Sequence, residues 1–244
     1  MLVMLTFRIP EIDKGTPSQL AHHRTVWGEL SWVAVAAATG FMVSAVGAAW
    51  LRLPRAQLVL ILGVAVGMLG AGYAHSHQLQ VKELVRQRWI WATIRGLLLG
   101  AVLILLALPD DSSAPAHGPR LVFDVAWLGV VYGIFDALLL NVLPMTACWR
   151  LATDLGWAST VTGRMKGGML TVAANLFVTT SYHLGYPEFR TPQELSGPLT
   201  GNLLIAIGYV LTPNPITSVV GHIILHVATV LSGSDGPVQL PPHY

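Results

Sequence analysis

The sequence predicts an all-α protein, a polytopic transmembrane helical bundle of about seven spans. Hydrophobic residues make up 53% of the chain and charged residues only 11%, and the mean hydropathy is +0.60. A soluble domain carries roughly 25% charged residues, so the composition indicates an integral membrane protein. The apolar residues also gather into runs, and a run of about 20 residues is what a helix needs to cross a bilayer.

Seven such runs are visible, and we predict one span in each: 29–51, 57–74, 90–108, 121–146, 166–186, 198–212 and 214–233. We expect one domain at 29–233, between a polar N-terminal segment at 1–28 and a polar C-terminal tail at 234–244. The last two spans meet at TPNP, where the prolines break the helix, so they form a tight hairpin or a partly re-entrant pair.

The segments between the spans also suggest roles. Residues 75–89 are polar and predict an interfacial helix. Residues 184–201 read as a loop whose Tyr186, Phe189 and Arg190 suit contact with a protein partner. Small residues four apart, Gly63 with Gly67 and Gly129 with Gly133, predict close packing of helices.

The distribution of Lys and Arg predicts a cytoplasmic N-terminus, because cytoplasmic loops are enriched in these residues. Nine basic residues fall on the side of the N-terminus: Arg8, Lys14, Arg24, Lys82, Arg86, Arg88, Arg150, Arg164 and Lys166. Four fall on the other side: Arg52, Arg55, Arg120 and Arg190. We also expect a plasma membrane of bacterial type. A net charge of +2 without a basic stripe argues against a nucleic-acid partner, which leaves membrane lipid and a protein partner or peptide substrate.

Ionisable residues deep inside spans are costly in lipid and usually functional. Asp136 lies in the fourth predicted span, and burial makes its ionised form costly, so it would take up a proton readily, as a general base must. His222 and His226 lie in the last span, four residues apart and therefore on one helix face. Such a pair suits a metal ion or a cavity wall with two imidazoles.

Two further polar residues complete the candidate site: Asn141, in the same span as Asp136, and His183, which ends the fifth span. We expect the Asp136 carboxyl to lie within roughly 8 Å of an imidazole of His222 or His226, a distance that one water can bridge. His183 would share the cavity if its span begins near Val172, later than the predicted residue 166, or if the LGYP segment turns inward.

The order of these groups resembles the CPBP family of intramembrane proteases, which includes CAAX prenyl endopeptidases and bacteriocin-processing proteins. Its acidic first motif is matched by Asp136 to Asn141, with Asp for the first Glu, Ala for the second and Asn for the Arg. Its Phe-x-x-x-His motif is matched by Thr179 to His183, and its last motif by His222 and His226, preceded by Pro-x-x-Ser. The resemblance covers about residues 120–232.

By this resemblance the chain is an intramembrane peptidase that works without metal. Asp136 is then the base that activates water, His183 contacts the water or the scissile carbonyl, and His222 and His226 stabilise the oxyanion, with Asn141 in support. Four alternatives stay open. The chain is an inactive member of the family, or an accessory or scaffold subunit that binds a protein or lipid. Otherwise it holds haem or a metal through His183, His222 and His226, or it is a transporter whose buried Asp and His relay protons.

Overall fold

The structure, a computed structural model, describes residues 19–107 and 117–233, and within these ranges every regular element is a helix. Residues 1–18 of the predicted N-terminal segment 1–28 lie outside the described residues, as does the whole predicted tail 234–244. Five helices of the described part are long and apolar enough to cross a membrane: Val26–Trp50, Arg55–Ser76, Trp89–Leu106, Pro119–Asp154 and Pro215–Ser232. The all-α class is confirmed, whereas the count of seven spans is not.

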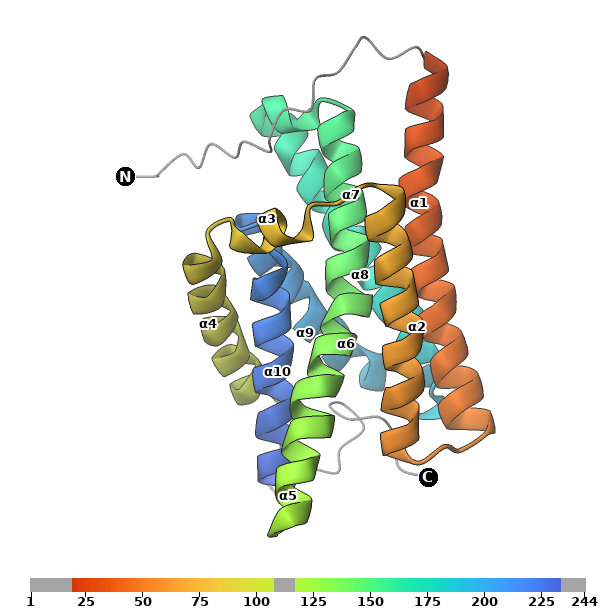
Figure 1. The fold of residues 1–244 in the computed structure, drawn as a ribbon, viewed down its shortest axis with the longest axis vertical. Coiled ribbons are helices and arrows are strands. Elements are labelled where there is room, and N and C mark those ends of the chain that lie inside the picture. Colours follow the sequence, from red (N-terminus) through yellow and green to blue (C-terminus); the bar gives the residue numbers. More distant parts are fainter. Residues whose placement is uncertain (1–18, 108–116, 234–244) are drawn as a thin grey trace.

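The helices form one upright bundle, and a short helix, α3, lies beside the upper ends of α4 and α10 (Figure 1). In chain order they are α1 (Gln19–Met42), η1 (Val43–Trp50), α2 (Arg55–Ser76), α3 (Val81–Arg86), α4 (Trp89–Ala107), α5 (Pro119–Asp124), η2 (Val125–Val131), α6 (Tyr132–Ala137), η3 (Leu138–Val142), α7 (Leu143–Asp154), η4 (Trp157–Ser159), α8 (Val161–Leu184), η5 (Pro187–Arg190), α9 (Pro192–Leu211) and α10 (Pro215–Ser232). The helix of the first span thus begins earlier than predicted, at Gln19, and the apolar span itself begins at Val26 rather than at residue 29.

The fourth predicted span is part of a much longer helix. The elements α5, η2, α6, η3 and α7 follow one another without a break from Pro119 to Asp154, alternating between α-helical and π-helical turns. The sequence placed the end of this span at residue 146, because Trp149 and Arg150 look like an interface. The helix continues through both of them and ends only at Leu155 and Gly156, where Gly156 takes a positive φ of 74°.

The other two predicted spans are helices, α8 and α9, but neither is among the five apolar spans. α9 begins at Pro192, capped by Thr191, whose Oγ1 accepts a hydrogen bond from Glu194 N. The prediction of a loop over 184–201 is therefore wrong beyond residue 191. Tyr186 and Phe189 are each only 2% exposed, so they pack into the core and offer nothing to a partner.

α10 lies between two helices that approach it along glycine pairs, and it contacts α4, η2 and α6. A Cβ built on Gly96 or Gly100 of α4 would lie 2.7 Å from the Cβ of Val220 or Ile224. On the other side, Cβ atoms built on Gly129 and Gly133 would lie 2.8 Å from Val227 Cγ2 and 3.0 Å from Ile223 Cα. The close packing predicted at Gly129 and Gly133 is confirmed, and the pair on α4 serves the same purpose.

The other predicted pair behaves differently at its two ends. A Cβ on Gly63 would meet the ring of Phe135, whereas a Cβ on Gly67 would meet nothing within 4 Å. The prediction of close packing is therefore wrong for Gly67, which faces open space.

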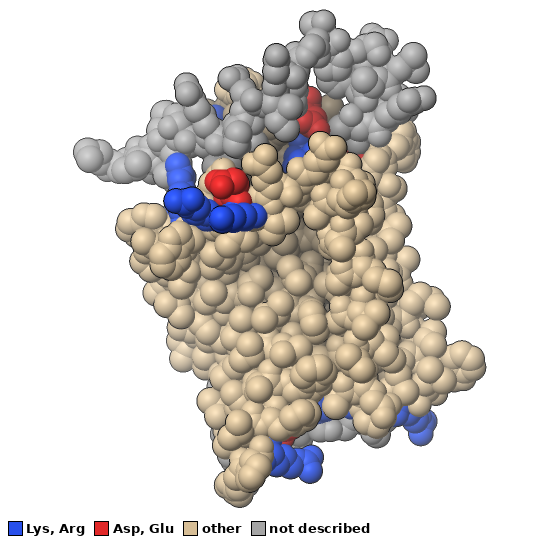
Figure 2. Space-filling view, viewed as in Figure 1, with Lys and Arg blue, Asp and Glu red and all other residues tan. Residues whose placement is uncertain are grey.

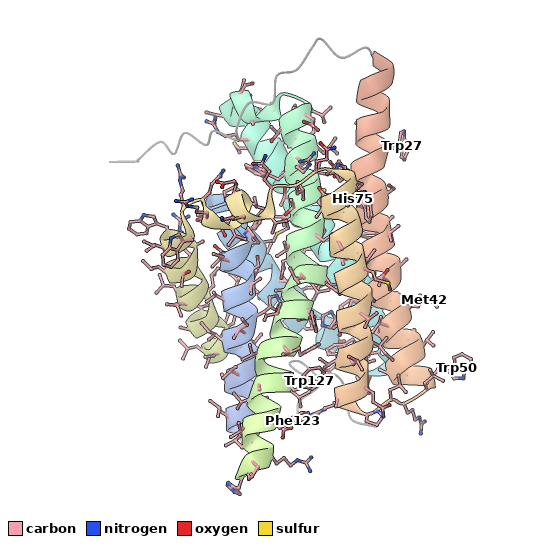
Figure 3. All side chains as sticks on the ribbon, in the orientation of Figure 1. Trp27, Met42, Trp50, His75, Phe123 and Trp127 are labelled. Carbon is pink, nitrogen blue, oxygen red and sulfur yellow. The ribbon has the colours of Figure 1, made fainter. Side chains whose placement is uncertain are left out.

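Charged side chains on the visible face gather at the two ends of the bundle, and the wide band between them is uncharged (Figure 2). Tryptophans mark the same two levels, because Trp27 and Trp50 lie near opposite ends of the first span and point away from the bundle (Figure 3). They are 64% and 76% exposed. This distribution is what a protein embedded in a bilayer shows.

We predict that Gly100→Ala lowers the thermal stability of the protein in detergent, because the added methyl has no room against Ile224. Overpacking of this kind costs about 1–3 kcal/mol. Gly67→Ala is the matched control, since its methyl enters open space and Ala favours a helix by about 0.5–1 kcal/mol. Melting temperatures measured by tryptophan fluorescence should fall for the first variant and hold or rise for the second. Equal losses would show that α4 does not approach α10 along this face.

Candidate functional site

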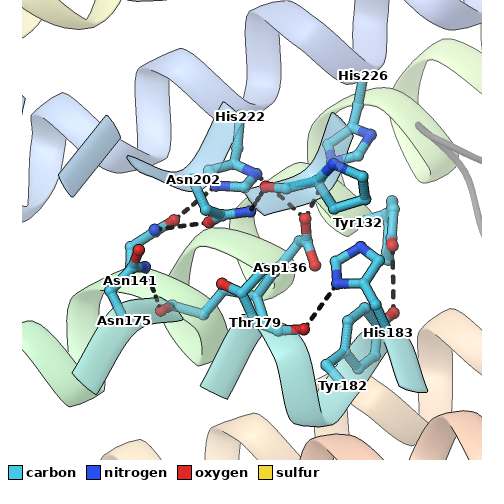
Figure 4. A network of polar contacts seen from close by, with 12 residues as sticks. Tyr132, Asp136, Asn141, Asn175, Thr179, Tyr182, His183, Asn202, His222 and His226 are labelled. Carbon is cyan, nitrogen blue, oxygen red and sulfur yellow. Dashed lines mark hydrogen bonds and ion pairs between the residues drawn. The ribbon is translucent and has the colours of Figure 1, made fainter. Parts of the chain in front are cut away.

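The candidate site lies where α6, α8 and α10 meet, and all of its predicted residues are buried (Figure 4). His222 Nδ1 lies 3.1 Å and His226 Nε2 3.2 Å from the same atom, Asp136 Oδ2. The expected proximity of Asp136 to these histidines is confirmed. The two imidazoles stack with ring centroids 5.9 Å apart, as their spacing on one helix face predicts.

A cavity of about 350 Å³ opens beside these groups, and Asp136, His183, His222 and His226 all line it. The remaining wall comes from α4, from residues 196–205 of α9 and from one further residue of α10: Leu103, Leu106, Ser196, Gly197, Pro198, Thr200, Gly201, Asn202, Ile205 and Leu225. The structure thus brings together the four residues that the sequence proposed, in a pocket with both polar and apolar walls.

His183 reaches the cavity for a reason that differs from the expected one. α8 does not begin near Val172 but earlier, at Val161. At about 1.5 Å per residue, His183 lies about 33 Å along α8 from its start, and Asp136 lies about 27 Å back from Asp154 along the preceding helix. Both distances run from the same turn, so the extension of α7 to Asp154 is what brings the two residues to similar depth.

A chain of amides fixes the position of the proton on His222. Asn202 Nδ2 donates to the carbonyl of Pro198 at 3.1 Å, and Asn202 Oδ1 accepts from Asn141 Nδ2 at 2.8 Å. Asn141 Oδ1 then accepts a hydrogen bond from His222 Nε2–H. Because a carbonyl can only accept, each donor and acceptor in this chain is determined by the one before it.

It follows that neutral His222 carries its proton on Nε2 and turns the lone pair of Nδ1 toward Asp136. Two lone pairs 3.1 Å apart repel, so the contact requires a proton on one partner or a cation beside both. The contact is also not aligned as a hydrogen bond, and Asp136 Oδ1 has no protein partner among the described residues. Asn141, which was proposed in a supporting role, therefore sets the tautomer of His222.

His183 is oriented in the same way. Its Nδ1 donates to the carbonyl of Thr179 at 2.8 Å, which leaves the lone pair on Nε2. Its ring is held edge-on between Tyr182 and Phe189, with centroid distances of 5.2 and 4.9 Å. His183 therefore enters the cavity as an acceptor.

A second buried polar group was missed by the sequence analysis. Glu29 is 1% exposed and accepts from Tyr73 Oη at 2.9 Å and from Arg150 Nε at 3.3 Å, which joins α1, α2 and α7. His77 Nδ1 lies 3.6 Å away, and burial, reinforced by Arg150, lowers the pKa of His77, so it approaches Glu29 as a neutral ring. A glutamate next to an apolar run was the available signal, but its partners are 44 and 121 residues distant.

Comparison with known proteins adds no family to this geometry. A scan against protein-family models gave no match, and neither did searches of curated proteins and of solved structures. The function of the site therefore has to be argued from its chemistry.

We predict that Asn141→Leu destabilises the protein by about 1–3 kcal/mol, because it leaves a buried N–H of His222 and the Oδ1 of Asn202 unpaired. Thr180→Ala is the control, since Thr180 Oγ1 bonds only to the Leu176 carbonyl of its own helix turn, outside this chain of amides. Thermal unfolding in detergent measures both. A loss no greater than that of the control would mean that the amides do not hold His222.

Proposed function

We propose that this chain is an intramembrane hydrolase of the peptidase type, with Asp136, His183, His222 and His226 as its working groups. One observation carries the proposal: a carboxylate and three imidazoles meet in one cavity inside an apolar bundle. Such groups are expensive in lipid, and a purely structural role would need only one partner for each. The resemblance to CPBP proteases supports the same activity.

In this proposal Asp136 is the general base. Its Oδ2 is engaged by His222 and His226, so Oδ1 is the oxygen that remains to accept a proton from water. The second O–H of that water donates a hydrogen bond to His183 Nε2 and keeps its proton, which aims an oxygen lone pair at the scissile carbonyl. The water oxygen bonds to the carbonyl carbon, the C–N bond breaks, and Asp136 passes its proton to the leaving amine.

The two histidines of α10 then divide the work differently from the roles that the resemblance implies. Asn141 holds His222 Nε2, and the Nδ1 lone pair of His222 faces Asp136, so His222 is suited to accept the proton that Asp136 takes from water. His226 donates from Nε2 to Asp136 and keeps Nδ1 without a protein partner, so His226 is the imidazole that remains to face a substrate.

The membrane setting belongs to the same proposal. We propose seven crossings, with α8 and α9 as the two less apolar ones, a plasma membrane of bacterial type and a cytoplasmic N-terminus. The substrate is then a peptide segment that reaches the cavity between α4 and α9, past Leu106 and Gly197.

We predict that Asp136→Asn lowers hydrolysis of quenched fluorescent peptides by about 100-fold or more, because the amide cannot take the proton of water. The protein, reconstituted in liposomes, is assayed against a peptide library, and circular dichroism checks the fold. Asp124→Asn is the control, since Asp124 lies on the same long helix but pairs with Arg120 outside the cavity. Turnover that persists in Asp136→Asn, or no turnover of any peptide by the unsubstituted protein, would contradict the proposal.

A metal centre is the second candidate function, and three observations favour it. The ligand atoms of Asp136, His222 and His226 lie within 4.8 Å of one another. Two ligand atoms that each lie about 2.0–2.1 Å from a tetrahedral Zn²⁺ are about 3.3 Å apart. The distances from His222 Nδ1 and His226 Nε2 to Asp136 Oδ2 are close to this value, at 3.1 and 3.2 Å. His222 and His183 also donate their other N–H to an oxygen, which is the usual outer shell of a metal-bound imidazole.

Haem has less support, because both nitrogens of His222 already have close partners. A single ion such as Zn²⁺ would polarise a carbonyl or lower the cost of ionising water, and so would serve hydrolysis as well.

We predict, for the metal candidate, about one Zn²⁺ per chain in protein purified without chelators, and its loss in His222→Ala. His77→Ala is the control, since His77 contacts Glu29 and lies outside the cavity. Elemental analysis measures the zinc, and Co²⁺ loading tests the site by its visible absorption. Zinc at background in the unsubstituted protein, with no Co²⁺ spectrum, would leave the metal-free hydrolase as the better account.

A further inference from the structure

One apolar hollow close to the candidate site has no part in the proposed reaction. It measures about 640 Å³ and lies between α2, α3, α10 and residues 138–146 of the long helix. Its walls are almost entirely carbon, from residues such as Gly67, Gly70, Leu84, Leu139 and Val219. We call this hollow the α3 groove. A hollow of this size and lining is typical of a ligand site.

The roof of the α3 groove is fixed in place. Asn214 is 1% exposed, and its Nδ2 donates to the carbonyls of Leu84 at 3.3 Å, Val85 at 3.0 Å and Gln87. Its Oδ1 accepts from Ile216 N at 2.8 Å and so caps α10. One side chain thus ties α3 to the start of α10, and the groove exists before any ligand arrives.

The rim of the groove is basic. A smaller hollow of about 460 Å³ adjoins it and shares Val81, Val85 and Ile216 with it, and this second hollow is lined by Lys82 and Arg86. Residues 82–88 hold three basic residues and one acid, Glu83. On the side where Figure 1 places α3, Figure 2 shows blue and red side chains together above uncharged surface.

The tryptophans beside the rim place it at the membrane surface. Trp89 and Trp91, at the start of α4, are 52% and 62% exposed. Exposed tryptophans of membrane helices sit at the level of lipid headgroups. The basic rim therefore lies at headgroup level, and the apolar groove extends from it toward the acyl chains.

We propose that the α3 groove binds one anionic phospholipid, with an acyl chain in the groove and the phosphate between Lys82 and Arg86. An apolar wall with a basic entrance is complementary to an anionic phospholipid, which has both an acyl chain and a phosphate. A soluble ligand that is only apolar or only anionic would fit one part of the site and leave the other empty. Arg86 can hold a phosphate with two parallel hydrogen bonds, and Lys82 adds a second cation.

The bound lipid would press on the helices that carry the candidate site. α10 turns Val219 and Val220 to the groove and His222 to the cavity, and residues 138–142 turn Leu139 to the groove and Asn141 to the amide chain. The proposal does not rest on the proposed hydrolase, because lipid binding and stability are measured without any substrate.

The experiment compares phosphatidylglycerol with phosphatidylcholine. Delipidated protein receives each lipid in detergent, native mass spectrometry counts the lipids retained, and melting temperature reports stability. We expect one phosphatidylglycerol per chain, retained at least tenfold better than phosphatidylcholine, and a melting temperature that rises more with it.

Two sets of variants test the two halves of the site. Lys82→Glu with Arg86→Glu should abolish the preference for phosphatidylglycerol, while Lys166→Glu, an exposed change on α8 away from the groove, should keep it. Gly67→Leu and Gly70→Leu should reduce retention of the lipid at least tenfold, because both glycines line the groove, a Cβ on either meets nothing within 4 Å, and the rest of the leucine would occupy the space of the acyl chain. Lys82→Gln with Arg86→Gln repeats the first test if the charge reversal fails to fold.

Several results would overturn the proposal. Equal retention of both lipids by the unsubstituted protein would show that the groove has no headgroup site. If Lys166→Glu lost the preference for phosphatidylglycerol as completely, the preference would come from the overall charge of the protein. Unchanged retention in Gly67→Leu would place the acyl chain elsewhere. A dimer that Gly67→Leu dissociates would make the groove an interface between two copies of the chain.

Discussion

The contact of one carboxylate oxygen with two imidazoles is the interaction on which this bundle depends. Asp136 Oδ2 lies 3.1 and 3.2 Å from His222 and His226, and all three side chains are almost completely buried. In an apolar bundle a carboxyl without partners costs several kcal/mol, so α6 and α10 have to meet at this level and in this rotation. The contact thereby sets the register of the two helices.

Such proximity needs a backbone that allows it, and glycine provides that. The pairs at Gly96 with Gly100 and at Gly129 with Gly133 let α10 approach the helices on either side of it. When two helix backbones lie close together, their side chains have only a short distance to span. The short side chain of an aspartate can then contact an imidazole, where a greater separation would need a glutamate. The pattern of small residues and the polar site are therefore two parts of one arrangement.

Much of this was predictable from the sequence, because lipid imposes few solutions. The spacing of His222 and His226 places both on one face, and the cost of burying Asp136 requires a partner, so their meeting followed from the residues alone. The depth of His183 did not follow, since it depends on where α7 ends, and Trp149 with Arg150 resembled the edge of a membrane rather than a helix interior. α9 was drawn too short although Thr191 and Glu194 form a capping pair, whose signal the two prolines at 192 and 198 obscured. The role of Asn202 depends on long-range pairing that no local pattern encodes.

All hydrogen bonds of the amide chain from Pro198 to His222 point in one direction. The chain therefore links the wall that α9 gives the cavity to the position of the proton on His222. Pro198 and Asn202 of α9 line the cavity, and so does His222 of α10. Every hydrogen bond in the chain points the same way only because the Pro198 carbonyl, at its outer end, can accept and never donate. A movement of α9 that withdrew this carbonyl would free both amides to turn over, and the proton of His222 would lose its fixed nitrogen. Through the Pro198 carbonyl, α9 thus fixes the direction of every hydrogen bond in the chain. It thereby also fixes which nitrogen of His222 presents a lone pair to Asp136.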